Sequence, residues 1–135
     1  MDSKSGADRF IAALHNLEQG TDESGVGGIV ELFADDAELV NTALLLGGET
    51  LHGKDGATEF WTQYKKTIGV GKSEFHHITS SENAAGLFWK TSVRDGAAQY
   101  DGSTLLDFDG SGKIRYFQGY YDTRQLNHAV GVEDK

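Results

Sequence analysis

Residues 85–121 read AGLFWKTSVRDGAAQYDGSTLLDFDGSGKIRYFQGYY, and apolar and polar side chains alternate with a period of two through most of this stretch. Such alternation is typical of β-strands. The clusters at 94–96 and 109–112 interrupt it with the Asp and Gly residues that hairpin turns favour. We therefore predict strands at 73–81, 85–94, 98–109 and 113–121. The intervals are too short for crossover helices, so these strands should form an antiparallel meander.

The N-terminal half has a helical period instead. Phe10, Ala13, Leu14 and Leu17 recur at i, i+3, i+4 and i+7, which predicts a first helix. The other predicted elements are, in chain order, a glycine-rich turn (20–28), a second helix (29–34), strands at 37–42 and 49–52 around an apolar loop (43–48), an aromatic third helix (57–68) and a C-terminal helical turn (122–129). Together they predict one α+β domain over residues 1–135. Its core should lie at about 9–126, with flexible termini, and three helices should wrap a curved antiparallel sheet around one pocket.

Charge and composition narrow the classes of partner. The formal net charge is −9 and no cluster of Lys or Arg offsets it locally, so we expect neither nucleic acid nor an anionic membrane as a partner. The chain contains no cysteine, which excludes disulfides, thiolate metal sites and cysteine nucleophiles. Its start lacks a basic and then apolar leader, and no run of about 18 apolar residues occurs. A cytoplasmic location is therefore the default expectation.

Several short segments, taken in their order along the chain, carry a family resemblance. They are RFIAAL (9–14), LFADDA (32–37), residues 53–61, GSGKI (110–114) and YYD (120–122). Over about residues 9–126 the chain resembles the nuclear-transport-factor-two-like superfamily, in its ketosteroid isomerase-like and SnoaL-like branches. The resemblance implies a cone-shaped, cystatin-like α+β roll with a pocket between the concave sheet face and the helices. It also implies a homodimer formed through the outer sheet face.

The resemblance locates the positions at which the isomerase chemistry would have to occur. Ketosteroid isomerase requires an Asp base, with a Tyr and a protonated Asp that hold the oxyanion. The corresponding positions here carry Asn41, Phe10 and Thr104. An amide is not a useful base near neutral pH. We therefore expect that this chain does not isomerise steroids by that mechanism.

Other side chains remain as candidates for chemistry. His77 could be a general base, since histidine titrates near pH 6.5, although a surface or hydrogen-bonded role is the simpler interpretation. Asp122 occupies the region in which SnoaL-like cyclases use an Asp to take a proton from an acidic carbon, yet we favour a helix-capping role because Gln125 follows three residues later. Tyr121 should face the pocket and orient a substrate. The predicted pocket lining is Phe10, Asn41, Trp61, Tyr64, Trp89, Thr104 and Phe117.

Histidine spacings typical of metal sites and glycine-rich cofactor loops are missing from the sequence, so we predict no metal and no cofactor. The leading hypothesis is a domain that binds a small apolar, carbonyl-bearing molecule. It could be a cofactor-independent enzyme that transfers protons, of the isomerase, cyclase, dehydratase (lyase) or hydrolase type. The alternative is a module of the same fold that binds a ligand or dimerises without catalysis.

Overall fold

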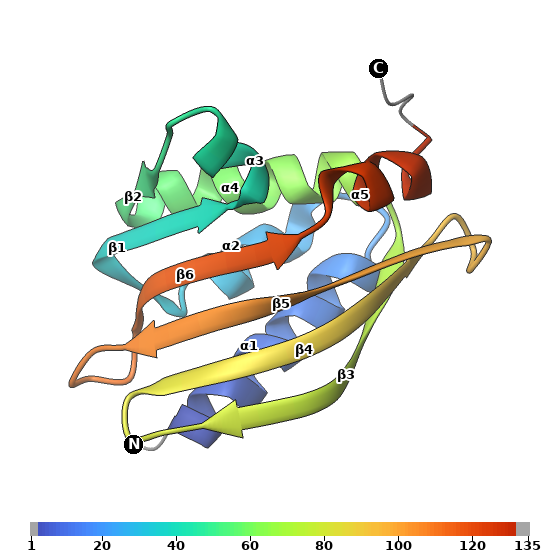
Figure 1. Ribbon diagram of the computed structural model, residues 1–135. Helices are drawn as coiled ribbons and strands as arrows, with labels where there is room; N and C mark the ends of the chain where they lie inside the picture. Colours follow the sequence, from blue (N-terminus) through green and yellow to red (C-terminus); the bar gives the residue numbers. More distant parts are fainter. Residues whose placement is uncertain (1–2, 132–135) are drawn as a thin grey trace.

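The computed structural model describes residues 3–131, and six strands form its single sheet in the order β2-β1-β6-β5-β4-β3 (Figure 1). The strands are β1 (Phe33–Asn41), β2 (Leu51–His52), β3 (Gly71–Ser80), β4 (Ala84–Val93), β5 (Ala98–Phe108) and β6 (Ile114–Tyr121). The helices are α1 (Ser3–Gln19), η1 (Glu23–Gly25), α2 (Val26–Val30), α3 (Thr42–Leu46), α4 (Gly53–Ile68) and α5 (Thr123–Ala129). Figure 1 shows α1, α2 and α4 on one face of the curved sheet.

This architecture confirms the predicted α+β fold of a curved sheet wrapped by helices. Ordered elements extend beyond the expected core of 9–126, because α1 begins at Ser3 and α5 ends at Ala129. The predicted flexibility of the chain ends concerns residues 1–2 and 132–135, which lie outside the described residues.

The meander from β3 to β6 has the predicted strand order and antiparallel pairing. One pair departs from the expectation of a purely antiparallel sheet, since β1 lies parallel to β6, with Leu39 opposite Phe117. These strands come from opposite ends of the chain, and no local pattern records their relative direction.

Two predicted elements of the N-terminal half were wrong. The second helix ends at Val30, and Phe33 begins β1 instead of continuing the helix. Ile114 donates its backbone N–H to the carbonyl of Leu32, and Phe33 pairs with Ile114, so contacts with β6 extend the strand toward the N-terminus. The apolar loop expected at 43–48 is instead largely the short helix α3.

The core lies between the inner sheet face and the helices. Phe10 of α1, Phe33 of β1, Trp61 of α4 and Phe117 of β6 are all nearly inaccessible to solvent and contact one another through their rings. Ring pairs with centroids 5–6 Å apart add attraction to the gain from burial. The aromatic cluster therefore fixes the position of both long helices against the sheet.

Candidate functional site

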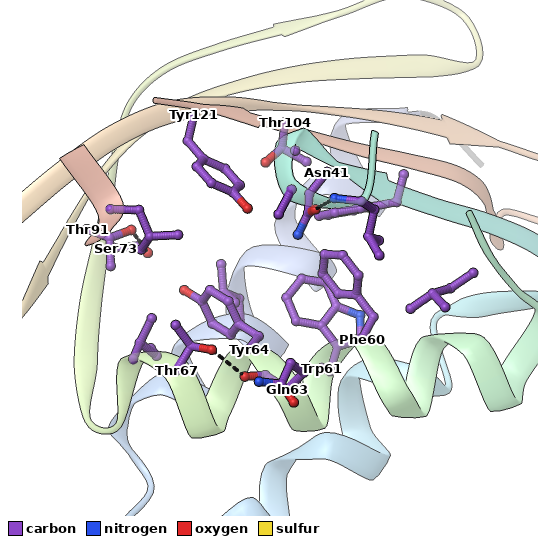
Figure 2. A pocket seen from close by; sticks show the side chains of 18 of the residues that line it. Asn41, Phe60, Trp61, Gln63, Tyr64, Thr67, Ser73, Thr91, Thr104 and Tyr121 are labelled. Atoms are coloured by element: carbon purple, nitrogen blue, oxygen red, sulfur yellow. Dashed lines mark hydrogen bonds between the residues drawn. The ribbon is translucent and has the colours of Figure 1, made fainter. Parts of the chain in front are cut away.

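A cavity of about 520 Å³ lies between the inner sheet face and α4 (Figure 2). All seven side chains predicted to line a pocket, from Phe10 to Phe117, line this cavity, and so does Tyr121. Strand alternation explains the sheet contribution: Thr104, Phe117 and Tyr121 all fall on the inner face of the register. The volume is within the range of about 300–1,000 Å³ that small-molecule sites occupy.

One wall of the cavity is a rigid aromatic surface. The rings of Phe60, Trp61 and Phe117 meet edge to face with centroids 4.8–5.2 Å apart. Trp61 Nε1 is buried and has no hydrogen-bond partner among the described residues. A wall of this kind favours planar or apolar ligands, because it offers area without requiring side chains to become ordered on binding.

Asn41, at the end of β1, presents a hydrogen-bond donor to the cavity. Its Oδ1 accepts the backbone N–H of Leu44 at 2.9 Å and so caps the start of α3. The carbonyl end of the amide is therefore engaged, and the NH₂ end is left for a ligand. The expectation that position 41 supplies no base agrees with this geometry.

Thr104 and Tyr121 add hydroxyl groups on the neighbouring strands. Thr104 Oγ1 accepts a hydrogen bond from Trp89 Nε1 at 2.9 Å, so the hydroxyl proton of Thr104 can be donated elsewhere. Figure 2 shows the phenol of Tyr121 directed into the cavity. Burial raises the pKa of Tyr121, which keeps this phenol protonated at neutral pH.

A buried polar network lies behind the other side of the cavity. Glu18 of α1 is fully buried, and its carboxylate accepts hydrogen bonds from Tyr64 Oη at 2.6 Å, from the Ser73 backbone N–H at 3.0 Å and from Ser73 Oγ at 2.5 Å. Ser73 Oγ also lies 2.6 Å from Thr91 Oγ1. Of these residues, Tyr64, Ser73 and Thr91 line the cavity, whereas Glu18 lies behind them.

Lys65 lies next to this network but bonds to the backbone. Its Nζ donates to the carbonyls of Glu18, Gly20 and Gly69 at 3.1, 2.5 and 2.7 Å. Burial lowers its pKa, and the nearby Glu18 carboxylate opposes that shift. Lys65 therefore joins the end of α1 to the end of α4 and does not neutralise Glu18 by direct contact.

The rim of the cavity is more polar than its interior. Glu59, Gln63 and Thr67 recur every four residues on α4 and form one exposed edge, and Glu49 lies on the rim as well. Leu44 of α3 lines the cavity, while Leu45 and Leu46 are 53% and 77% exposed. Of the three leucines in the segment predicted as an apolar loop, only Leu44 contacts the cavity.

The candidate base His77 lies on the outer face of the sheet. Phe75 pairs with Trp89, but the next pair is His77 with Phe88, so His76 is an extra residue in β3. A one-residue bulge moves each later side chain to the opposite face. His77 is therefore exposed, with its ring centroid 5.6 Å from that of Phe88. His77 therefore does not line the cavity.

Asp122 caps a helix, as we favoured. Its Oδ1 accepts the backbone N–H of Arg124 at 2.8 Å and of Gln125 at 3.3 Å at the start of α5. The side chain of Gln125 does not reach back to Asp122 and accepts the N–H of Asp101 instead. Asp122 is exposed and does not line the cavity, so the geometry gives it no place in chemistry there.

Sequence reasoning missed Glu18, Ser73 and Thr91. A signal for Glu18 was available, because it lies four residues after Leu14 on the apolar stripe of α1, where a carboxylate needs a partner. Ser73 and Thr91 occupy inner positions of their strands, but a small hydroxyl there gives no sign that it belongs to a network.

No three His, Cys, Asp or Glu side chains within residues 3–131 come close enough together to hold a metal ion. In the same range, no helix has the length and apolar character needed to cross a membrane.

Comparisons with known proteins agree with this architecture. A family model described as "SnoaL-like domain" matches residues 7–117, whereas a search of curated protein sequences finds no match. TerC, co-crystallised with polyporic acid, is 16% identical with a TM-score of 0.75, over 96% of this chain and 98% of that one. An NTF2-like protein of unknown function from Cytophaga hutchinsonii ATCC 33406 is 14% identical, with a TM-score of 0.68 over 93% and 95% of the two chains. One from Exiguobacterium sp. 255-15 is 23% identical, with a TM-score of 0.66 over 87% and 98%.

Proposed function

The chain belongs to the SnoaL-like domain family, and on that premise we propose that its cavity binds a small, uncharged, largely apolar molecule that carries a hydrogen-bond acceptor such as a carbonyl group. The observation that carries the proposal is the pairing of the aromatic wall with inward-facing donors. Asn41 Nδ2 and the hydroxyls of Thr104 and Tyr121 can all donate, and the buried Glu18 is screened from the cavity by other side chains.

Charge at the mouth supports an uncharged ligand. Glu49 and Glu59 are exposed on the rim, and the whole chain carries a formal net charge of −9. Both would repel an anion before it entered the apolar interior, where a charge loses most of its hydration. Binding of nucleic acid or an anionic membrane is disfavoured for the same reason, and the cytoplasmic location stays an expectation.

We favour binding without turnover over proton-transfer catalysis. A catalytic base must lie within hydrogen-bond reach of the proton that it removes. His77 and Asp122 lie outside the cavity, and the carboxylates that line it, Glu49 and Glu59, are solvated rim groups. TerC, which has the same fold, was co-crystallised with polyporic acid, and this supports the use of such folds to hold small molecules.

We also propose a homodimer formed through the outer sheet face. Phe88 and Tyr120 lie on that face, 39% and 45% exposed. Exposed aromatic side chains at the centre of a sheet face are the usual anchors of protein interfaces.

Calorimetric titration with 2-acetylnaphthalene tests the binding proposal, because this probe is planar, uncharged and carries one carbonyl. We expect saturable binding at one site per chain. Gly119→Val should weaken it at least tenfold, or about 1.4 kcal/mol. A Cβ at position 119 would make ordinary contacts at 3.7 Å with Asn41 and Phe117, and because Gly119 lines the cavity the valine side chain should occupy cavity space.

The matched control is Gly110→Val, in a turn where a Cβ meets nothing within 4 Å. This variant should bind like the parent protein. Equal affinities of 2-acetylnaphthalene for the parent and Gly119→Val proteins would contradict the proposed site. Chemical conversion of this ketone or of related ketones in a turnover assay would favour the enzyme alternative.

A further inference from the structure

The Glu18 network fixes the direction of the hydroxyl protons on one side of the cavity. The hydroxyls of Tyr64 and Ser73 both donate to the carboxylate of Glu18, and the backbone N–H of Ser73 donates to its other oxygen. Each hydroxyl has a single proton. The contact between Ser73 Oγ and Thr91 Oγ1 therefore requires Thr91 to be the donor.

Tyr100 of β5 lies beside this network, since it pairs with Thr91 of β4. It is almost fully buried and lines the cavity. Burial raises the pKa of Tyr100, so its proton is present at neutral pH.

The consequence is a cavity wall that accepts hydrogen bonds. The hydroxyls of Tyr64, Ser73 and Thr91 form the acceptor end of the cavity, because their protons are directed into the network around Glu18 and only lone pairs remain for a ligand. An aligned chain of this kind resists reversal, since each hydrogen bond polarises the next one.

The opposite side of the cavity has the reverse polarity. Asn41, Thr104 and Tyr121 form the donor end, as described above. In Figure 2, Ser73 and Thr91 gather on one side of the cavity and Asn41 lies on the other. Asn41 is on β1 and Thr91 on β4, three strands apart in the sheet order. At about 4.8 Å per strand the two backbones are roughly 14 Å apart, enough for two fused rings between the side chains.

We propose that the ligand is a flat hydroxy-ketone or a close analogue, which places its carbonyl at the donor end and donates a hydroxyl or N–H proton to the acceptor end. Glu18 is then a positioning residue, which never touches the ligand but holds the acceptor end in its accepting state. This inference rests on the proposed function. It adds that the ligand carries a second polar group, a hydrogen-bond donor, at the end opposite its carbonyl group.

Three naphthalenes test the proposal by calorimetry. They are 2-acetyl-6-hydroxynaphthalene, with both groups, 2-acetylnaphthalene, which lacks the donor, and 2-ethyl-6-hydroxynaphthalene, which lacks the carbonyl. We expect the first to bind at least tenfold more tightly than either of the others. If 2-acetylnaphthalene binds as tightly as its hydroxy analogue, this inference is wrong while the proposed function stands. Failure of all three probes to bind would overturn both.

Glu18→Gln separates positioning from simple structural support. The glutamine NH₂ would donate to the hydroxyls of Tyr64 or Ser73 and release a proton toward the cavity, so the preference for the hydroxylated probe should fall to less than about threefold. If Glu18 only supported the structure, Glu18→Gln would weaken the binding of 2-acetyl-6-hydroxynaphthalene and 2-acetylnaphthalene equally. An unchanged ratio of the two affinities would therefore contradict the proposal.

A second variant keeps the test independent of the stability of Glu18→Gln. Thr91→Val preserves the side-chain shape and removes one acceptor, and it should also reduce the preference. Glu74→Gln is the matched control, since Glu74 follows Ser73 in the chain but is exposed on the outer face. Glu74→Gln should bind 2-acetyl-6-hydroxynaphthalene with the same preference over 2-acetylnaphthalene as the parent protein. If Thr91→Val also kept that preference, the proposed acceptor end would be wrong.

Discussion

Replacing Glu18 with alanine should destabilise the fold strongly. The carboxylate joins three elements, since its own helix α1 is bonded to Tyr64 of α4 and to Ser73 of β3. Glu18→Ala leaves a cavity and removes the acceptor from three donors, one of which is a backbone N–H in a buried strand position.

The size of the effect follows from these contacts. A hydrogen bond to a charged group contributes roughly 1.5–3 kcal/mol, and leaving buried donors unsatisfied costs at least as much. Water from the adjacent cavity can reach Tyr64 and Ser73, which limits the loss. We therefore expect Glu18→Ala to lower the free energy of unfolding by about 3–5 kcal/mol, and Glu18→Gln, which keeps the volume and one acceptor oxygen, by about 1–2 kcal/mol.

Urea unfolding followed by tryptophan fluorescence measures this difference, provided that the m-value is unchanged. The control is Glu74→Gln, which removes the same charge from an exposed position and should change stability by less than about 0.5 kcal/mol. A Glu18→Ala protein within about 1 kcal/mol of the parent would refute the argument that this network holds α1 to the sheet.

Three further predictions follow from particular residues. Burial raises the pKa values of Tyr64, Tyr100 and Tyr121, so the stabilisation that these phenols contribute should be full below the unfolded-state pKa of about 10 and decrease above it, because the unfolded chain then loses protons that the folded one keeps. Urea titrations between about pH 8 and pH 11 measure this, and increasing stability above pH 10 would contradict it. Gly102→Ala should lower the free energy of unfolding by several kcal/mol, since its Cβ would lie 2.1 Å from the Tyr120 carbonyl oxygen. The control Gly27→Ala has open space around its Cβ and should be neutral or stabilising by about 0.5–1 kcal/mol in thermal unfolding. Equal effects of the two variants would show that the backbone approach at Gly102 is not tight. The double variant Phe88→Glu/Tyr120→Glu should convert a dimer into a monomer of 14.6 kDa in light scattering, and an unchanged mass would place the interface elsewhere.

The C-terminal meander could be predicted because each of its signals is local. Alternation and turn residues lie within one hairpin, and the predicted bounds of β3 to β6 agree with the structure to within two residues at every end. The aromatic lining could be predicted for the same reason, since alternation fixes the face of Phe117 once the strand is known. The cap at Asp122 is likewise a property of four consecutive residues.

The remaining features depend on contacts between distant segments. The bulge at His76 reverses the face of His77, and nothing in the sequence of β3 marks the extra residue. The parallel pairing of β1 with β6 extends the first strand back to Phe33, where local periodicity favoured a helix. Glu18 could be recognised as buried from its helix face, but its partners Tyr64 and Ser73 are 46 and 55 residues away along the chain.

Backbone amide chemical shifts in a titration with 2-acetylnaphthalene test the central claim most directly, because they show both that the probe binds and where it binds. We predict saturable shifts at Gly119, Thr104 and Tyr64, which surround the cavity, and none at His77 or Phe88 on the outer sheet face. Shifts confined to the outer face, or no saturable shift at all, would contradict the account.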